Sequence, residues 1–418
     1  MRPATKRRIH KSRLLALAAA AVACCALLSR RRGSGSSSSS SSGSGSGSGG
    51  GGGSNSTQAA ASLEAAFGAG DAGCPVSYHR HTVDEIRHGA KPYLLGGIAQ
   101  RPGCTNCRPG GEGAEWAGIC QFKAGQLCTE DISHWITWAW IERGHELALR
   151  LTPCDLWRHV SGRTLWVLGD SMSLDLWKAA QCFLFEFWQE PRPVNATQDA
   201  EVQEQFSRLL LSTCAVLQQG TRVCYVRVDK GGEIVSRVLP LLPRVAAPTD
   251  LLVVNFGLHH GGREDYDASL AAFTEYVQAH RDALPRVLWH QTSQQHFAGG
   301  SGEYPGGQGP FECTQIANFS VVRDGVVELE PGKTDPFNLL AGNWRNAAAD
   351  AAMRAAGIPT MPSYNETVWM HDMHRWNERG LECTHFCHPS APQTWVVALY
   401  RALQGPQPAG TDSSAGAG

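Results

Sequence analysis

The fold of this chain can be read from Thr164-Leu-Trp-Val-Leu-Gly-Asp-Ser-Met-Ser173. Residues Thr164 to Leu168 form a short apolar run that ends at Gly169, which is typical of a strand buried on both faces of a parallel sheet. Apolar residues then recur at helical spacing from Leu174 to Phe187 and predict a helix. The stretch therefore predicts a buried strand, a glycine-containing turn and a helix in direct succession.

Ser171 lies on the predicted turn, where its hydroxyl is exposed and the first N–H groups of the helix point at any anion formed beside it. Acyl transfer needs this combination of a nucleophile and an oxyanion site. A cap is the alternative, since Asp170, Ser171 and Ser173 are all good helix N-caps. The Gly-Asp-Ser turn alone leaves both interpretations open, and catalysis requires a base.

Two more buried strands follow, at Leu251–Val254 before Asn255 and at Arg286–Trp289 before His290. Helical stretches lie between and after them, at residues 268–283 and 343–356. Strands that alternate with helices predict an α/β fold with a mostly parallel sheet flanked by helices. Because sites form at the carboxyl ends of parallel strands, we expect Ser171, Asn255 and His290 at one edge of the sheet.

A candidate base lies near the C-terminus, in Leu381-Glu-Cys-Thr-His-Phe-Cys387. If this segment is a tight turn, Glu382 can orient the imidazole of His385, and that imidazole can activate a serine. The flanking cysteines could hold the turn by disulfides. Two alternatives remain: a surface loop with incidental charges, and zinc ligation by Cys383, His385, Cys387 and His388.

The composition gives a domain layout and excludes one class of partner. The 418 residues carry 37 basic and 38 acidic side chains, and no basic face that would bind nucleic acid is evident. We expect a cytosolic basic stub at 1–13, an apolar segment at 14–28, a disordered Gly/Ser-rich stalk at 29–58, a catalytic body at 59–403 and a disordered tail at 404–418. Within the body, the part up to Leu149 is expected to be loop-rich.

The apolar segment suits either a signal-peptide core or a short signal anchor, since fifteen residues span only about 22 Å as a helix. No small-residue cleavage site follows, which favours an anchor with a lumenal body over a secreted protein. An Arg-rich organelle transit peptide is a further alternative. Fourteen cysteines, twelve of them in the body, favour disulfides over zinc in an oxidising compartment.

The Gly-Asp-Ser stretch and the segment Glu382-Cys-Thr-His-Phe-Cys-His-Pro389 together resemble the paired motifs of the trichome birefringence-like family, which are PC-esterase, SGNH-type polysaccharide O-acetyltransferases. Intervening pieces are similar in the same order, and the likeness covers roughly Cys104 to Leu403. These pieces are Trp138-Ala-Trp140, Cys154-Asp-Leu156, Leu252-Val-Val-Asn-Phe-Gly-Leu-His259, Thr292-Ser-Gln-Gln-His-Phe297 and Pro392-Gln-Thr-Trp395.

The resemblance implies roles for individual residues. Ser171 would be the nucleophile, His385 the general base, and Glu382 would take the place of the family's Asp. The oxyanion hole would combine the Ser171 N–H with Asn255 and Gly257, and Asp372 is a reserve for the acid. Disulfides would tie an N-terminal segment to the core and to the histidine loop, through Cys104 or Cys107, Cys120, Cys128, Cys154, Cys182, Cys313, Cys383 and Cys387, with Cys74, Cys214 and Cys224 unassigned.

The implied reaction transfers acetyl groups to polysaccharide hydroxyls through an acyl-serine, with no cofactor and no metal. A membrane transporter would supply the acetyl donor, and the chain would be a single-pass type II Golgi membrane protein. An acetyl esterase and a catalytically silent glycan-binding relative are the alternatives. Other polar or aromatic residues could line the site or be structural: Trp135, Trp138, Trp140, His259, His260, His290 and His296.

Overall fold

The computed structural model describes residue 67 and residues 73–95, 127–128, 130–190, 192–298, 302–307, 309–316, 319–321, 327–335, 340, 342–377 and 380–405. The predicted stub, apolar segment and stalk, and the tail beyond residue 405, lie outside these residues. Among the described helices, none combines the length and the apolar character needed to cross a lipid bilayer.

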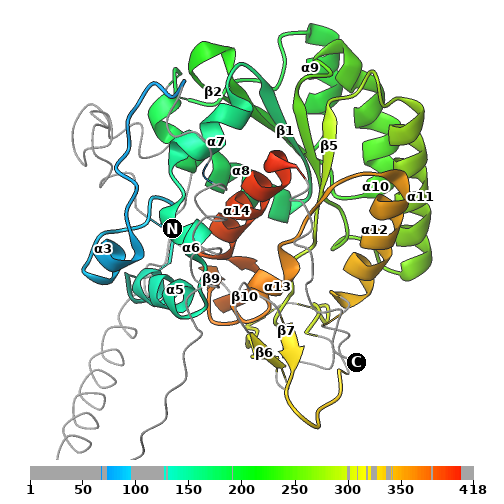
Figure 1. The fold of residues 1–418 in the computed structure, drawn as a ribbon. Helices are drawn as coiled ribbons and strands as arrows, with labels where there is room; N and C mark the ends of the chain where they lie inside the picture. Colours follow the sequence, from blue (N-terminus) through cyan, green and yellow to red (C-terminus); the bar gives the residue numbers. More distant parts are fainter. Residues whose placement is uncertain are drawn as a thin grey trace, which may run out of the picture. The chain divides into compact units, whose positions relative to one another are not determined.

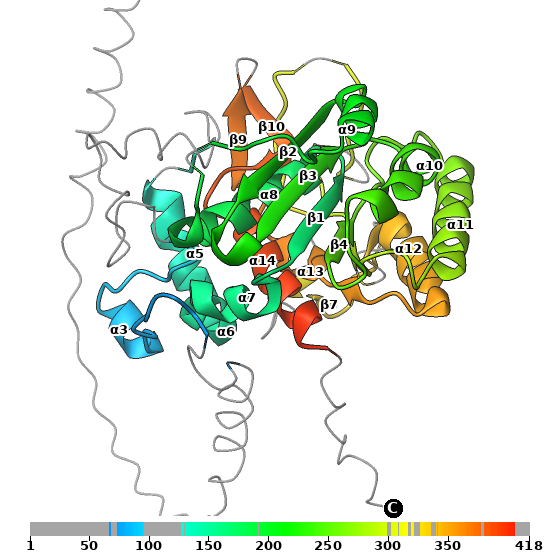
Figure 2. The same cartoon turned by 90° about the horizontal axis from the view of Figure 1, so that it is seen from above.

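The core of the fold is a six-stranded sheet with the strand order β2-β3-β1-β4-β5-β8 (Figure 2). All neighbouring strands are parallel except β2, which pairs antiparallel with β3 at one edge. The α/β architecture with a mostly parallel sheet is therefore confirmed. The strands are β1 (Thr164–Gly169), β2 (Leu211–Val216), β3 (Arg222–Arg227), β4 (Leu251–Val254), β5 (Arg286–His290) and β8 (Thr360–Met361).

The packing of strand β1 explains why residues Leu165 to Leu168 are all apolar. Leu165 and Val167 pack into a cluster with helices α7 (Pro153–Val160), α8 (Ser171–Phe183) and α14 (Ala391–Gln404) on one face of the sheet. Trp166 and Leu168 pack into a second cluster with α9 (Ala200–Ser207), α11 (Arg263–Ala279) and α12 (Asn343–Ala356) on the other face. Figure 1 shows these helices around the sheet. Because side chains alternate between faces, a strand covered on both sides has no polar position.

The flanking helices agree with the prediction at some ends and differ at others. Helix α12 (Asn343–Ala356) has the predicted bounds, whereas α11 runs over Arg263–Ala279 and therefore begins and ends earlier than expected. Helix α8 (Ser171–Phe183) begins three residues before the predicted Leu174 because Asp170 caps it, and a 3₁₀ turn continues to Phe187. The other helices covering the sheet are α7 (Pro153–Val160), α9 (Ala200–Ser207) and α14 (Ala391–Gln404).

The expectation of a loop-rich segment before Leu149 is wrong for its described second half, which is helical. It contains α5 (Glu130–Glu142) and α6 (Glu146–Arg150), with the short α3 (Val83–Arg87) upstream. Helix α5 buries Ile136 and Trp140, four residues apart, and so packs one face on the core. The sequence interpretation considered the aromatic residues of this segment but not their helical spacing, and it therefore missed the helix.

The described fold also contains the antiparallel hairpin β9 (His374–Asn377) and β10 (Gly380–Phe386), the hairpin β6 (Phe319–Val321) and β7 (Val327–Leu329), and the short helices α10 (Gly231–Glu233) and α13 (Tyr364–Thr367). Four disulfides join described residues: Cys74–Cys154, Cys128–Cys387, Cys214–Cys224 and Cys313–Cys383. The expected disulfide framework is confirmed for these pairs. Cys104, Cys107 and Cys120 lie outside the described residues.

Candidate active site

The turn after β1 is built around a glycine that no other residue can replace without strain. Gly169 has φ +148°, and a Cβ there would lie 2.2 Å from the carbonyl oxygen of Asn255. The hydroxyl of Tyr225 on β3 donates to the carbonyl oxygen of Asp170 at 2.8 Å. The backbone on both sides of the turn is therefore fixed by neighbouring strands, and Ser171 follows at the carboxyl end of the sheet.

Asp170, and not Ser171, is the N-cap of α8. Its carboxylate accepts a hydrogen bond from the Met172 N–H at 2.9 Å. Burial raises the pKa of Asp170, and the bond from Met172 acts in the opposite direction. The capping function is thus filled by the preceding residue, which leaves the hydroxyl of Ser171 for another partner.

That partner is His385, 214 positions further along the chain. Its Nε2 lies 2.6 Å from the Oγ of Ser171, and its Nδ1 hydrogen-bonds to Oε2 of Glu382. The side chains of His385 and Glu382 are 15% and 19% exposed, so the pair is shielded yet open on one side. Hydroxyl, imidazole and carboxylate thus form one hydrogen-bonded array, as general-base activation of a serine requires.

Glu382 is held as a carboxylate by several groups. Its oxygens accept the backbone N–H groups of Thr384 and His385, both at 3.2 Å. Burial by itself raises the pKa of Glu382, but the hydrogen bond from His385 and the charges of His385 and Arg375 lower it below its ordinary value. The extra methylene of glutamate, compared with aspartate, is thus accommodated without loss of the bond to His385.

The expected tight turn around His385 is wrong: Glu382 to Phe386 belong to β10. The pairing of β10 with β9 shifts register between Glu382 and Phe386, and such an irregularity re-aims side chains next to active sites. A strand without it would direct residues 382 and 385 to opposite faces of the hairpin. The irregularity therefore allows the carboxylate and the imidazole to meet.

Disulfides on both sides fix this segment. Cys383 is bonded to Cys313, and Cys387 to Cys128. Because both sulfurs are consumed in disulfides, the alternative of a zinc site made of Cys383, His385, Cys387 and His388 is wrong. The cross-links tie β10 to two segments far from it in sequence.

Two charged residues that the sequence analysis did not single out connect the two halves of the array. Arg375 on β9 is the cross-strand partner of Glu382, with its Nε 3.5 Å from Oε2. Its Nη1 lies 3.7 Å from Oδ1 of Asp175, a buried residue of α8. Asp175 comes four residues after Ser171, on a helix that also buries the polar residues Ser173, Lys178 and Gln181.

Asn255 and Gly257 lie at the carboxyl end of β4, beside the Ser171 turn. The amide nitrogen of Asn255 donates to the carbonyl oxygen of His290 at 2.8 Å and to Oγ1 of Thr292 at 3.0 Å. Both of its hydrogens are used, so in this arrangement the side chain has none to offer an oxyanion. Gly257 is buried, and its carbonyl oxygen accepts from Nε of Arg345 at 3.1 Å.

Asp372 occupies a different place from Glu382. It is exposed on the turn before β9, and Glu382, not Asp372, bonds the Nδ1 of His385. Of these two carboxylates, Glu382 is therefore the one in contact with His385.

The remaining candidate residues fall into two groups, one buried and one partly exposed. His260 and His296 are buried and hydrogen-bonded within the fold, to Asp265 and to Val368 and His374 respectively. His290 is buried at the end of β5, and burial lowers its pKa to about 3. None of the contacts described for these three histidines is with the side chain of His385. Among the other candidates, Trp140 is a core residue, whereas the following are partly exposed: His259, Trp135 and Trp138.

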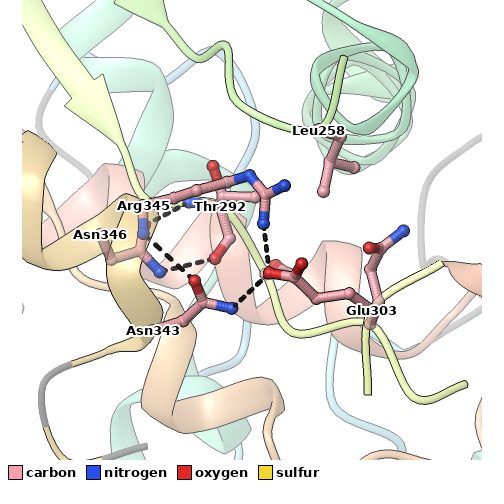
Figure 3. Close-up of a pocket in the computed structure, with 8 residues that line it drawn as sticks. Leu258, Thr292, Glu303, Asn343, Arg345 and Asn346 are labelled. Carbon is pink, nitrogen blue, oxygen red and sulfur yellow. Dashed lines mark hydrogen bonds and ion pairs between the residues drawn. The ribbon is translucent and has the colours of Figure 1, made fainter. Parts of the chain in front are cut away.

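A polar recess lies at the same edge of the sheet, at the ends of β4 and β5 (Figure 3). It is small, with a cavity volume of about 10 Å³, and is lined by Leu258, Thr292, Ser293, Gln295, Glu303, Asn343, Arg345 and Asn346. Arg345 forms an ion pair with Glu303, and Asn346 holds the backbone of Thr292 with two hydrogen bonds. Gln295 donates to Oγ1 of Thr384 at 2.8 Å, which links the recess to the segment that carries His385.

The fold and the array together define an α/β protein with a Ser–His–Glu arrangement suited to acyl transfer. A scan against protein-family models finds no match, and a search of curated proteins finds no relative. Any assignment of activity therefore depends on the chemistry of the site and on the motif resemblance.

Proposed function

We propose that this protein is an SGNH-type, serine-dependent O-acetyltransferase that transfers acetyl groups to polysaccharide hydroxyls. One observation carries the proposal: the 2.6 Å contact between Oγ of Ser171 and Nε2 of His385, with Glu382 on the other ring nitrogen. A serine in this contact is an activated nucleophile. The resemblance of the two motif segments to the trichome birefringence-like family supports acetyl as the group and a glycan as its acceptor.

The reaction has two steps, acetylation of the serine and transfer of the acetyl group to the sugar. In the first, Oγ of Ser171 attacks the carbonyl carbon of the acetyl donor while Nε2 of His385 takes the hydroxyl proton and passes it to the leaving group. An acetyl-serine ester remains. In the second step, a sugar hydroxyl loses its proton to His385 and attacks that ester, and the proton returns to Oγ as the serine is released.

The negative charge that develops on the acetyl oxygen needs a donor, and the start of α8 supplies one. The first N–H groups of a helix lack intrahelical acceptors, and the Met172 N–H is already taken by Asp170. The Ser171 N–H is therefore the leading donor, with Gly257 as the second. Asn255 can contribute only by giving up its bond to His290 or Thr292.

The polar recess at the ends of β4 and β5 has room for about one water, so it offers polar groups beside the site and not a pocket for a whole sugar. Its lining consists mostly of amide, hydroxyl and charged groups, which suit hydrogen bonds to sugar hydroxyls better than contacts to an apolar ligand. Under this proposal a membrane transporter supplies the acetyl donor, and the N-terminal apolar segment anchors the body in the Golgi lumen.

Labelling of the full-length chain with a fluorophosphonate probe tests the nucleophile. We expect the wild type to be labelled and Ser171→Ala to show no labelling. Ser173→Ala, which removes a neighbouring buried hydroxyl, is the matched control and should be labelled like the wild type. A catalytically silent glycan-binding relative would leave Ser171 unmodified, and that result would overturn the proposal.

Acceptor dependence separates a transferase from an esterase with the same array. The full-length chain is incubated with an acetyl-ester dye, with and without oligosaccharide, and both free acetate and acetylated sugar are measured. We expect acetylated sugar to form at the expense of acetate. Acetate release that no oligosaccharide diminishes would replace the transferase with an acetyl esterase.

A further inference from the structure

A second cluster of chemically reactive side chains lies before α3, outside the array described above. In the extended segment 79–81, Arg80 points into the protein, where its guanidinium bonds both oxygens of the buried Asp155 at 2.7 and 2.8 Å. His79 and His81 flank Arg80 on either side, and His79 is exposed. The buried ion pair of Arg80 thus anchors the chain between the two imidazoles.

Further contacts hold the two histidine rings near each other. Their centroids are 5.2 Å apart. The ring of His81 stacks on Tyr93, also with 5.2 Å between centroids, and the hydroxyl of Tyr93 donates to the carbonyl oxygen of His79 at 3.0 Å. The disulfide from Cys74 to Cys154 ties the preceding residues to the start of α7.

Glu85 in the first turn of α3 completes the cluster. One of its oxygens accepts from the backbone N–H and the hydroxyl of Thr82, at 2.7 and 3.0 Å, in a capping box. The other oxygen is directed at Nε2 of His79, 2.9 Å away. Thr82 therefore orients the carboxylate in the way that outer groups orient ligands in metal sites.

We propose that His79, His81 and Glu85 form a binding site for a divalent transition-metal ion of the zinc type. Their candidate ligand atoms all lie within 4.8 Å of one another, and within the described part of the chain they are the one such group of three. Two imidazoles and a carboxylate suit zinc, whereas calcium and magnesium take oxygen ligands. A small contraction, with the metal replacing the bond between His79 and Glu85, brings the three ligands to coordination distance.

The location of the site determines what a bound ion would do there. The side chains of His79 and Glu85 are 66% and 44% exposed, so three protein ligands would leave a fourth position open to water. A bound ion would also join the extended segment 79–81 to α3, in addition to the Arg80 ion pair. The inference does not depend on the proposed acetyl transfer, because none of its residues touches Ser171 or His385 in the described contacts.

Cobalt(II) titration of the full-length chain, with its disulfides intact and free thiols alkylated, tests the site. We expect visible absorption bands of tetrahedral cobalt in the wild type and their displacement by zinc. His79→Ala/His81→Ala should abolish the bands, and Glu85→Gln should weaken zinc binding more than about tenfold, because loss of an outer group that only orients a ligand already costs about that much.

The matched control is His88→Ala, which removes another exposed histidine close by, at the end of α3. It should leave the cobalt spectrum and the zinc affinity unchanged. Equal binding by the wild type and His79→Ala/His81→Ala would overturn the proposal, as would an equal loss in His88→Ala. Circular dichroism of each variant establishes that the fold is retained, and Glu85→Gln tests the site without altering either histidine.

Discussion

The two halves of the Ser–His–Glu array are held in place by different means. Ser171 is placed mainly by residues next to it in the chain, namely strand β1, Gly169 and the Asp170 cap, and Tyr225 on the neighbouring strand holds the turn with one hydrogen bond. His385 is held by its neighbours Cys383 and Cys387, whose disulfides reach Cys313 and Cys128 over sequence separations of 70 and 259, and by Glu382, which pairs with Arg375 across the hairpin. The position of the serine follows mainly from the local strand–turn–helix sequence. The position of the histidine depends on disulfides to residues far away in the chain.

The largest expected effect separates the acid at 382 from its reserve. Glu382→Gln keeps the size of the side chain but cannot stabilise a protonated His385, and we expect the rate of acetyl-serine formation to fall on the order of 10⁴-fold. Asp372→Asn is the matched control and should change the rate less than about threefold. Pre-steady-state acetylation of the full-length chain measures both. A larger loss in Asp372→Asn would return the acid role to Asp372.

The next effect concerns the disulfides. Removing the Cys313–Cys383 pair with serines opens a loop of 70 residues and should lower the free energy of unfolding by about 4 kcal/mol. The Cys214–Cys224 pair joins neighbouring strands with a separation of 10, so loss of this disulfide should lower the free energy of unfolding by about 3 kcal/mol.

The two double variants should differ more in kcat than in stability. Cys383 is two residues before His385, whereas Cys214 and Cys224 lie on β2 and β3 at the sheet edge. We expect kcat, measured at a temperature where both remain folded, to fall only in Cys313→Ser/Cys383→Ser. Equal losses in the two variants would mean that the disulfide beside His385 contributes only general stability.

The same difference between local and long-range contacts explains what the sequence could predict. The strand β1, the turn at Gly169 and helix α12 were readable because apolar runs and helical periods are local signals. The strands β2, β3 and β8 were missed because β2 contains polar residues, β3 begins and ends with arginine, and β8 has only two residues. The irregularity in β10 was also missed, because a register shift is decided by the partner strand and by the cross-links.

Within the site, the sequence indicates the residue types but not all of their hydrogen-bond and ion-pair partners. Glu382 and His385 follow from chemistry and spacing, yet the competing bonds of Asn255 depend on Thr292 and His290, which the fold brings next to it. Arg375 and Asp175 act only through their spatial neighbours. A charged residue opposite the acid in a hairpin is invisible until the register is known.

The smallest expected effect tests the tie between the halves through Arg375. Arg375→Gln removes an ion pair to a largely buried carboxylate, worth about 1 kcal/mol, so kcat/KM at neutral pH should fall about fivefold. Arg263→Gln, which breaks an exposed pair with the same 3.5 Å separation to Asp267, is the matched control and should have no effect. Arg375→Lys should recover part of the loss.

The pH dependence of Arg375→Gln gives the sharper test, because it distinguishes an electrostatic role from packing. The pKa of Glu382 lies below its ordinary value of 4.5, so the ionised acid stabilises the array above that value and its contribution is lost as the pH falls through the lowered pKa. Removing the Arg375 cation raises the pKa of Glu382, which moves this acid-side loss to higher pH. Ester hydrolysis by the wild type and the variant between about pH 3 and 7 should show the shift, and parallel profiles would reduce Arg375 to a packing residue of the β9–β10 hairpin.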